Sequence, residues 1–193
     1  DVELRHCDMT RSDIFTYDTL LSAMHEAALP SLLTHRLSLH LLCGLKARRA
    51  IAIAEEHLRD GKSVVFSIVH TGDASLARQR HRGAMAPVPM AVETLEHHDV
   101  DPSIVEKVRE HLPLDAADEV VAHFGGDVVA ELTGRRHRFV RKGEQWELEA
   151  TRPCDEVDAF QSGRKRVALL SRAGGVGTSL HDTGSGQRVH IIL

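Results

Sequence analysis

The sequence predicts an α/β domain with a mainly parallel sheet. Two apolar runs near the C-terminus, Val167–Leu170 and Val189–Leu193, have the length and β-branched content of buried parallel strands. A third run, 62–69, follows a helical stretch and leads into Thr71-Gly72. Between the first two runs, residues 171–179 form a loop rich in glycine and hydroxyl groups. Ligands of open α/β sheets bind beyond the carboxyl ends of the strands, so this loop is the first candidate site.

Composition fits one domain, or one domain with an appendage, in 193 residues. Hydrophobic residues make up 42% and aromatic residues only 4%, which predicts an aliphatic core. The net charge of −4 argues against a generally basic surface but not against local basic patches. Such patches occur at Arg135–Arg138, Arg141-Lys142 and Arg164–Arg166.

Apolar spacing predicts three helices in the N-terminal section, at 11–29, 31–43 and 46–59. Thr10 and Asp13 have the spacing of a capping box at the start of the first helix, and Pro30 ends it. Asp60-Gly61 closes the third helix before the strand at 62–69. Residues 2–9 carry a weak strand signal.

Residues 78–100 show no sustained period, and we interpret them as a long surface excursion. Alternation on both sides of Lys142-Gly143 predicts a β-hairpin over 138–149. The remaining elements are short helices at 104–112, 116–124 and 154–161 and a short strand at 128–132.

The glycine-rich loop resembles part of a phosphate-binding P-loop but lacks its lysine. Thr178 stands where the lysine would precede the hydroxyl residue, and Ala173 stands where the deviant form carries its lysine. The missing lysines argue against a self-sufficient nucleoside triphosphate site, and the spacing does not fit the dinucleotide fingerprint either. Backbone amides and the hydroxyl of Ser179 can still donate to a phosphate. A tight strand–helix turn without a ligand is the alternative.

Two further strand-end turns have the same character. Thr133-Gly134-Arg135 follows a strand and precedes more arginines, and Thr71-Gly72 follows the strand at 62–69. Each is weak evidence alone, because basic loops are usually only solvated. Three such turns at one sheet edge would form a track for nucleic-acid phosphates.

The sequence gives no sign of a metal site, a disulfide framework or a membrane span. Of the 14 histidines only His97-His98 are adjacent, and no metal-binding spacing occurs, so we expect no metal. Cys7, Cys43 and Cys154 are too scattered for a disulfide framework, and we expect free thiols. No apolar run approaches the ~18 residues of a membrane span, so we expect no membrane partner.

Several segments together resemble a known family. These are Val64-Val65-Phe66-Ser67 with Thr71-Gly72, Glu131-x-Thr-Gly-Arg135, Phe160-x-x-Gly163-x-Lys165, Ser171-x-Ala-Gly-Gly-x-Gly-x-Ser179-Leu180 and Arg188-Val189-His190. In this order they resemble the C-terminal, second RecA-like domain of superfamily 2 helicases, more narrowly the strawberry-notch type. The resemblance implies a three-layer RecA-like fold over 46–193, with 1–45 as a helical lead-in.

The resemblance also implies roles for single residues. Gly175, Gly177 and Ser179 would contribute to an ATP site shared between two lobes. The residues expected to contact nucleic acid are Thr71, Gly72, Thr133, Gly134, Arg135, Ser171 and Gly174. Ser179 stands where many members have Asp, which weakens the expected ribose contact.

What the chain lacks bears on activity. Walker A and Walker B belong to the first lobe, and motif VI with its arginine finger would follow Leu193; an arginine finger contributes ~10³–10⁵ in rate. We therefore expect a fragment of a longer helicase that has no catalytic residues of its own and is inactive alone. ATP with Mg²⁺ would bind only the intact protein, with DNA (or RNA) and the first RecA-like lobe as partners.

The expected location is intracellular: cytoplasmic in a bacterium or phage, nuclear in a eukaryote. Two alternatives stay open. One is a non-enzymatic nucleic-acid-binding or protein-interaction domain with a degenerate helicase fold. The other is a small α/β enzyme that binds a mononucleotide by itself.

Overall fold

The computed structural model describes residues 9–69, 71–98, 100–171 and 187–193. It confirms the α/β fold. Four strands form one fully parallel sheet in the order β2-β5-β1-β6. Their bounds are β1 Ser63–Ile68, β2 Val129–Leu132, β5 Val167–Ser171 and β6 Arg188–Ile192. All four lie within about one residue of the predicted strands.

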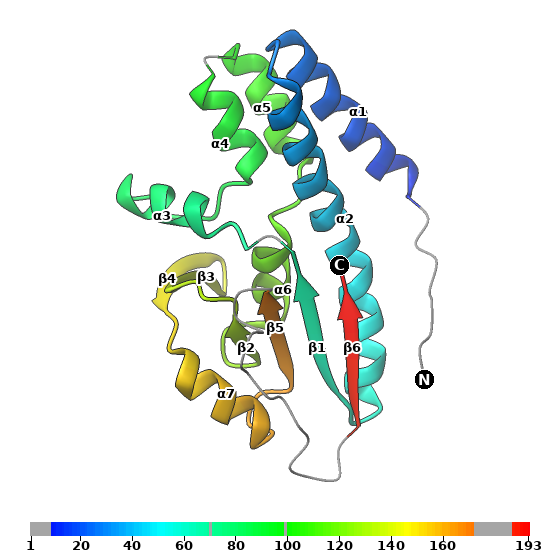
Figure 1. Cartoon of the computed structure of the whole chain (residues 1–193), viewed down its shortest axis with the longest axis vertical. Helices are drawn as coiled ribbons and strands as arrows, with labels where there is room; N and C mark the ends of the chain where they lie inside the picture. The colour runs from blue at the N-terminus through cyan, green and yellow to red at the C-terminus, as the bar shows by residue number, and fades with distance from the viewer. Residues whose placement is uncertain (1–8, 70, 99, 172–186) are drawn as a thin grey trace.

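Helices cover both faces of this sheet, which confirms the three-layer architecture (Figure 1). Val64 and Phe66 of β1 are fully buried on the face covered by α2 (Ser31–Arg59) and α6 (Ala116–Phe124). Val65 points to the opposite face, against Phe160 of helix α7 (Pro153–Gln161). The two central strands, β1 and β5, are largely apolar on both faces because both faces are buried.

Helix α2 corrects one prediction. The sequence predicts a break between two helices near Gly44, yet Ser31–Arg59 is one continuous helix. Gly44 is buried there, and a Cβ built on it would lie 2.7 Å from the backbone oxygen of Leu114. The glycine that weakens the helical pattern therefore permits a close approach of the 112–115 segment. The predicted boundary at 45/46 falls inside this helix.

The interpretation of 78–100 as a surface excursion is wrong. The segment holds the end of α3 (Asp73–His81) and all of α4 (Met90–His97). Four apolar residues of α4 are buried, namely Met90, Ala91, Val92 and Leu95. They join a helical core formed with α1 (Arg11–Glu26), α2 and α5 (Pro102–His111). An eight-residue helix is too short to show a sustained period.

The predicted hairpin is confirmed as β3 (His137–Lys142) paired antiparallel with β4 (Gln145–Ala150). Phe139 and Val140 anchor it, since both are buried. The strand expected at 2–9 lies almost wholly outside the described residues. None of the described helices is long and apolar enough to cross a membrane.

Candidate nucleic-acid interface

The carboxyl ends of three parallel strands meet at one edge of the sheet. Ile68 of β1 pairs with Ser171 of β5, and Leu132 of β2 pairs with Leu170. Thr71-Gly72 and Thr133-Gly134 follow directly, so both turns extend from this edge (Figure 1). The convergence expected of the strand-end turns is therefore present for the described part of all three.

Side chains tie the turns to one another. The Ser171 hydroxyl donates to the backbone oxygen of Thr133 at 2.8 Å, which links the ends of β5 and β2. Nη1 of Arg135 donates to the backbone oxygen of Thr71 at 3.3 Å, which links the turns after β2 and β1. The Thr151 hydroxyl donates to the backbone oxygen of Arg135. Hydrogen bonds thus join the turns after β1 and β2 and the end of β5 into one network.

Arg135, one of the residues expected to contact phosphate, is buried at this edge. Its side chain is fully buried, with Nε 2.5 Å from Glu131 Oε1 and Nη1 2.8 Å from Asp118 Oδ1. Burial alone would lower the pKa of Arg135, but the two carboxylates outweigh it and raise that pKa. A guanidinium enclosed in this way stays charged and does not reach a phosphate in this conformation.

The other residues expected to contact nucleic acid differ in how far they are exposed to solvent. Thr133 and Ser171 are buried, and the Thr133 hydroxyl donates to Glu131 Oε1 at 2.6 Å. Gly134 is exposed, and Thr71 and Gly72 are partly exposed. A phosphate approaching this edge therefore meets the backbone of the turns and the Thr71 hydroxyl. Gly174, Gly175, Gly177 and Ser179 lie outside the described residues.

The Phe160-x-x-Gly163-x-Lys165 segment also has a structural explanation. Phe160 is buried under the sheet. Nζ of Lys165 donates to the backbone oxygens of Gly126 and Val129 at 2.7 and 3.0 Å and lies 2.7 Å from Glu156 Oε2. Arg138 donates to the same two oxygens, both at 3.1 Å. These two cations hold the turn that precedes β2.

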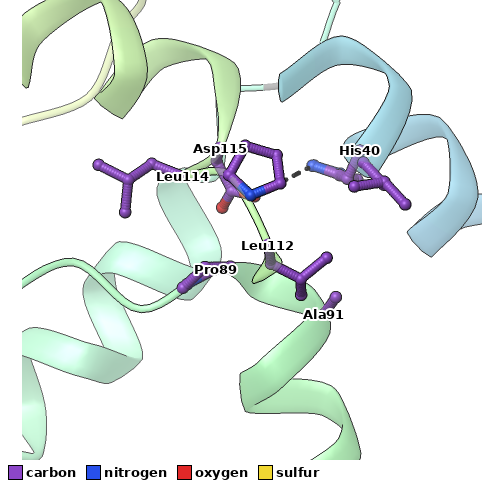
Figure 2. Close-up of a pocket in the computed structure, with 8 residues that line it drawn as sticks. His40, Pro89, Ala91, Leu112, Leu114 and Asp115 are labelled. Carbon is purple, nitrogen blue, oxygen red and sulfur yellow. Dashed lines mark ion pairs between the residues drawn. The ribbon is translucent and has the colours of Figure 1, made fainter. Parts of the chain in front are cut away.

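Asp115, which directly precedes α6, faces His40 of α2 in the helical section (Figure 2). Its Oδ1 accepts from the backbone N–H of Met90 at 3.4 Å and lies 4.0 Å from His40 Nδ1. Burial, reinforced by the charge of Asp118, raises the pKa of Asp115 to about 7. The adjoining pocket has a volume of about 10 Å³, close to the space of one water molecule, so it is too small for a nucleotide.

The structure draws attention to exposed basic residues outside the predicted site residues, two of which lie in the supposed excursion. Arg80 and Arg82 are exposed at the end of α3, and Arg136 is exposed directly after Arg135. The run Arg78-Gln-Arg-His-Arg82 was the available signal, but it fell inside the supposed excursion. Among the described residues, no group of three His, Cys, Asp or Glu is placed to hold a metal ion.

Comparison with known proteins agrees with this architecture. Residues 115–193 match the family described as the C-terminal domain on Strawberry notch homologue. Protein FORGETTER 1 of Arabidopsis thaliana is 35% identical over 107 residues, 47% of this chain and 8% of that protein. Protein strawberry notch of Drosophila melanogaster is 35% identical over 104 residues, 46% of this chain and 6% of that protein.

A third relative extends the similarity further along the chain. Protein strawberry notch homolog 2 of Mus musculus is 30% identical over 156 residues, 68% of this chain and 11% of that protein. The chain thus spans about a tenth or less of the length of these relatives. No solved structure was found to match it. Residues 115–193, with their RecA-like sheet edge, belong to the strawberry-notch type of helicase C-terminal domain.

Proposed function

We propose that this chain is the second lobe of an ATP-dependent superfamily 2 DNA helicase or translocase. Its role would be to contribute nucleic-acid phosphate contacts and part of an ATP site between two lobes. The observation that carries the proposal is that hydrogen bonds join the turns after β1 and β2 to each other and to the end of β5 at one sheet edge. That edge is where open α/β sheets bind ligands.

The phosphate contacts would come from backbone more than from side chains. Gly134 is exposed, and Thr71 and Gly72 are partly exposed, while Arg135 beneath them fixes the Thr71 carbonyl. Backbone N–H groups held in turns bind anions without reading base identity. The lobe would therefore grip a DNA or RNA strand independently of its sequence.

The ATP contribution rests on the resemblance and on the family. Gly175, Gly177 and Ser179 are the residues concerned, with the rest of the site and its Mg²⁺ coming from a first RecA-like lobe. Such a protein would work inside the cell, in the nucleus of a eukaryote or the cytoplasm of a bacterium. Closure and opening of the two lobes would alternate the grip on the strand.

The test measures ATP hydrolysis by the full-length protein that carries this chain, with and without a DNA oligonucleotide. We expect hydrolysis that DNA stimulates, and none from the 193-residue chain alone. Ser179→Ala in the full-length protein should lower this hydrolysis, while Ser162→Ala, at an exposed position after α7, should not.

Two results would contradict the proposal and point to its alternatives. ATP binding by the isolated chain at the affinity of the full-length protein would favour a mononucleotide-binding enzyme. A full-length protein that binds DNA but hydrolyses no ATP would favour a non-enzymatic nucleic-acid-binding domain.

A further inference from the structure

Three exposed arginines lie next to the candidate interface, and one of them, Arg82, interacts electrostatically with Glu93 without forming an ion pair with it. Within the described ranges, the guanidinium groups of Arg80, Arg82 and Arg136 form no ion pair with a carboxylate. Other basic side chains of the same region do have partners. Arg78 pairs with Glu93, Arg138 with Glu149 and Glu156, Lys142 with Glu147 and Glu149, and Lys165 with Glu156.

These arginines form one group, which we call the basic cluster: Arg80, Arg82 and Arg136 with His137. Nη1 of Arg80 lies 3.4 Å from Nδ1 of His137, which joins the end of α3 to the start of β3. Figure 1 shows α3 above the β3–β4 hairpin, on the side of the sheet where β1 ends. Because α3 begins after Gly72 and β3 follows the Gly134 turn, the basic cluster continues the interface outward.

Local stability does not account for this arrangement. Cations in the last turn of α3 gain about 0.3–1 kcal/mol from the helix dipole, but Arg136 lies outside any helix. Within the described residues these three guanidinium groups have no carboxylate at ion-pair distance, and the phosphates of a polyanion would supply that negative charge.

We propose that the basic cluster binds the phosphate backbone of a nucleic-acid strand, extending the track beyond the strand-end turns. This rests on the proposed function for its partner and names residues that the resemblance does not. Neither α3 nor residues 133–138 contain Phe, Tyr or Trp, so the large rings that usually stack on single-stranded bases are missing here. The contacts are therefore ionic, independent of base sequence and strongly sensitive to salt.

The experiment measures binding of a fluorescein-labelled dT20 oligonucleotide by the 193-residue chain, from fluorescence anisotropy over a KCl series. The test variant carries Arg80→Gln, Arg82→Gln and Arg136→Gln. Its matched control removes three exposed arginines of α2 that form no ion pair with a described residue, namely Arg36→Gln, Arg49→Gln and Arg59→Gln. Both variants lose the same net charge. Arg59 lies at the opposite, amino edge of the sheet, just before β1.

Counterion release sets the expected size of the effect. Each phosphate contact on a single strand contributes about 0.7 to the slope of log K against log salt, so three contacts contribute about 2. We expect the test variant to lose about 2 from the slope and to bind on the order of 10–100-fold more weakly at 0.1 M salt. The control should keep the wild-type slope to within roughly 0.5, and Arg136→Gln alone should lose about 0.7.

Each other outcome overturns the inference in a distinguishable way. If the chain binds dT20 but the test variant keeps the wild-type slope, the basic cluster is refuted while the proposed function stands. If both triple variants lose the same slope, only net charge matters. If the wild-type chain fails to bind at 50 mM salt, the nucleic-acid role of the lobe fails as well. If the substitutions weaken binding to phosphatidylserine vesicles but not to dT20, the partner is a membrane surface.

Discussion

Replacing Arg135 by Met tests whether this residue stabilises the sheet edge from inside. The substitution keeps a long apolar side chain but removes the cation between Glu131 and Asp118, whose carboxylates lie 2.5 and 2.8 Å from it. Breaking a buried ion pair by removing one partner costs about 3–5 kcal/mol, because the remaining charge stays buried and uncompensated. Domains of this kind are stable by about 5–15 kcal/mol, so the loss is a large fraction of the total.

The same reasoning predicts how the loss depends on pH. Without Arg135, less offsets the burial that already raises the pKa of Asp118, so that pKa lies further above its value in the unfolded chain. The Asp118 carboxylate destabilises most above its folded pKa, and this contribution disappears as pH falls below the unfolded value. The destabilisation by Arg135→Met should therefore shrink between pH 7.5 and pH 4.5. Adding Glu131→Gln should restore at least about 1 kcal/mol at pH 7.5.

Urea denaturation of the 193-residue chain, followed by far-UV circular dichroism, measures these differences from the midpoint and slope. Arg136→Met is the matched control. The Arg136 side chain is next in sequence but exposed, so this substitution should change stability by less than about 0.5 kcal/mol. A loss below about 1 kcal/mol for Arg135→Met, or one that does not shrink in acid, would refute the buried-pair account. If the folded fraction of the Arg135→Met variant binds dT20 with the wild-type salt slope, Arg135 stabilises the fold and makes no phosphate contact.

Three further substitutions test other parts of the structure. Gly44→Ala should destabilise by about 1–3 kcal/mol in urea despite the better helix propensity of Ala, because its Cβ would lie 2.7 Å from a backbone oxygen; a stabilised variant would contradict this packing. Burial raises the pKa of Asp115 to about 7, so the folded protein loses stability as pH rises toward and through 7 and this carboxyl is forced to ionise. Asparagine cannot ionise, so the stability of Asp115→Asn relative to wild type should increase by about 3–4 kcal/mol between pH 4 and pH 8. A parallel pH dependence of the two proteins would refute that assignment. Lys165→Met should lower the free energy of unfolding by only about 1–2 kcal/mol, because Arg138 still donates to the backbone oxygens of Gly126 and Val129. It should leave dT20 binding unchanged if Lys165 is structural.

The sheet could be predicted from sequence because its strands are marked locally. Runs such as Val64–Ile68 and Val167–Leu170 are apolar on both faces, and small polar turns follow them. The hairpin is equally local, since the alternation around Lys142-Gly143 fixes both strands and the turn. Parallel topology then places the strand-end turns at one edge without further information.

The errors occurred where long-range packing overrides local pattern. Gly44 weakens the helical pattern of α2, yet the segment around Leu114 packs against it and the helix continues. Helix α4 is held by burial of Val92 and Leu95 against distant helices, which no eight-residue window reveals. The burial of Arg135 likewise depends on a distant residue. One of its two carboxylate partners, Asp118, lies on helix α6.

These corrections change how the Glu131-x-Thr-Gly-Arg135 element is understood. Glu131 and Arg135 neutralise each other beneath the surface and hold Thr133, whose hydroxyl and carbonyl are both occupied. Gly134 is left exposed with φ at +82°, a conformation that other residues rarely adopt. The element thus presents a fixed stretch of backbone, with no long side chain to order when a ligand arrives. Preorganisation of this kind lowers the entropy cost of binding. If the lobe binds a polyanion as proposed, the charges that attract it from a distance belong to a different group of residues, the basic cluster beside α3 and β3.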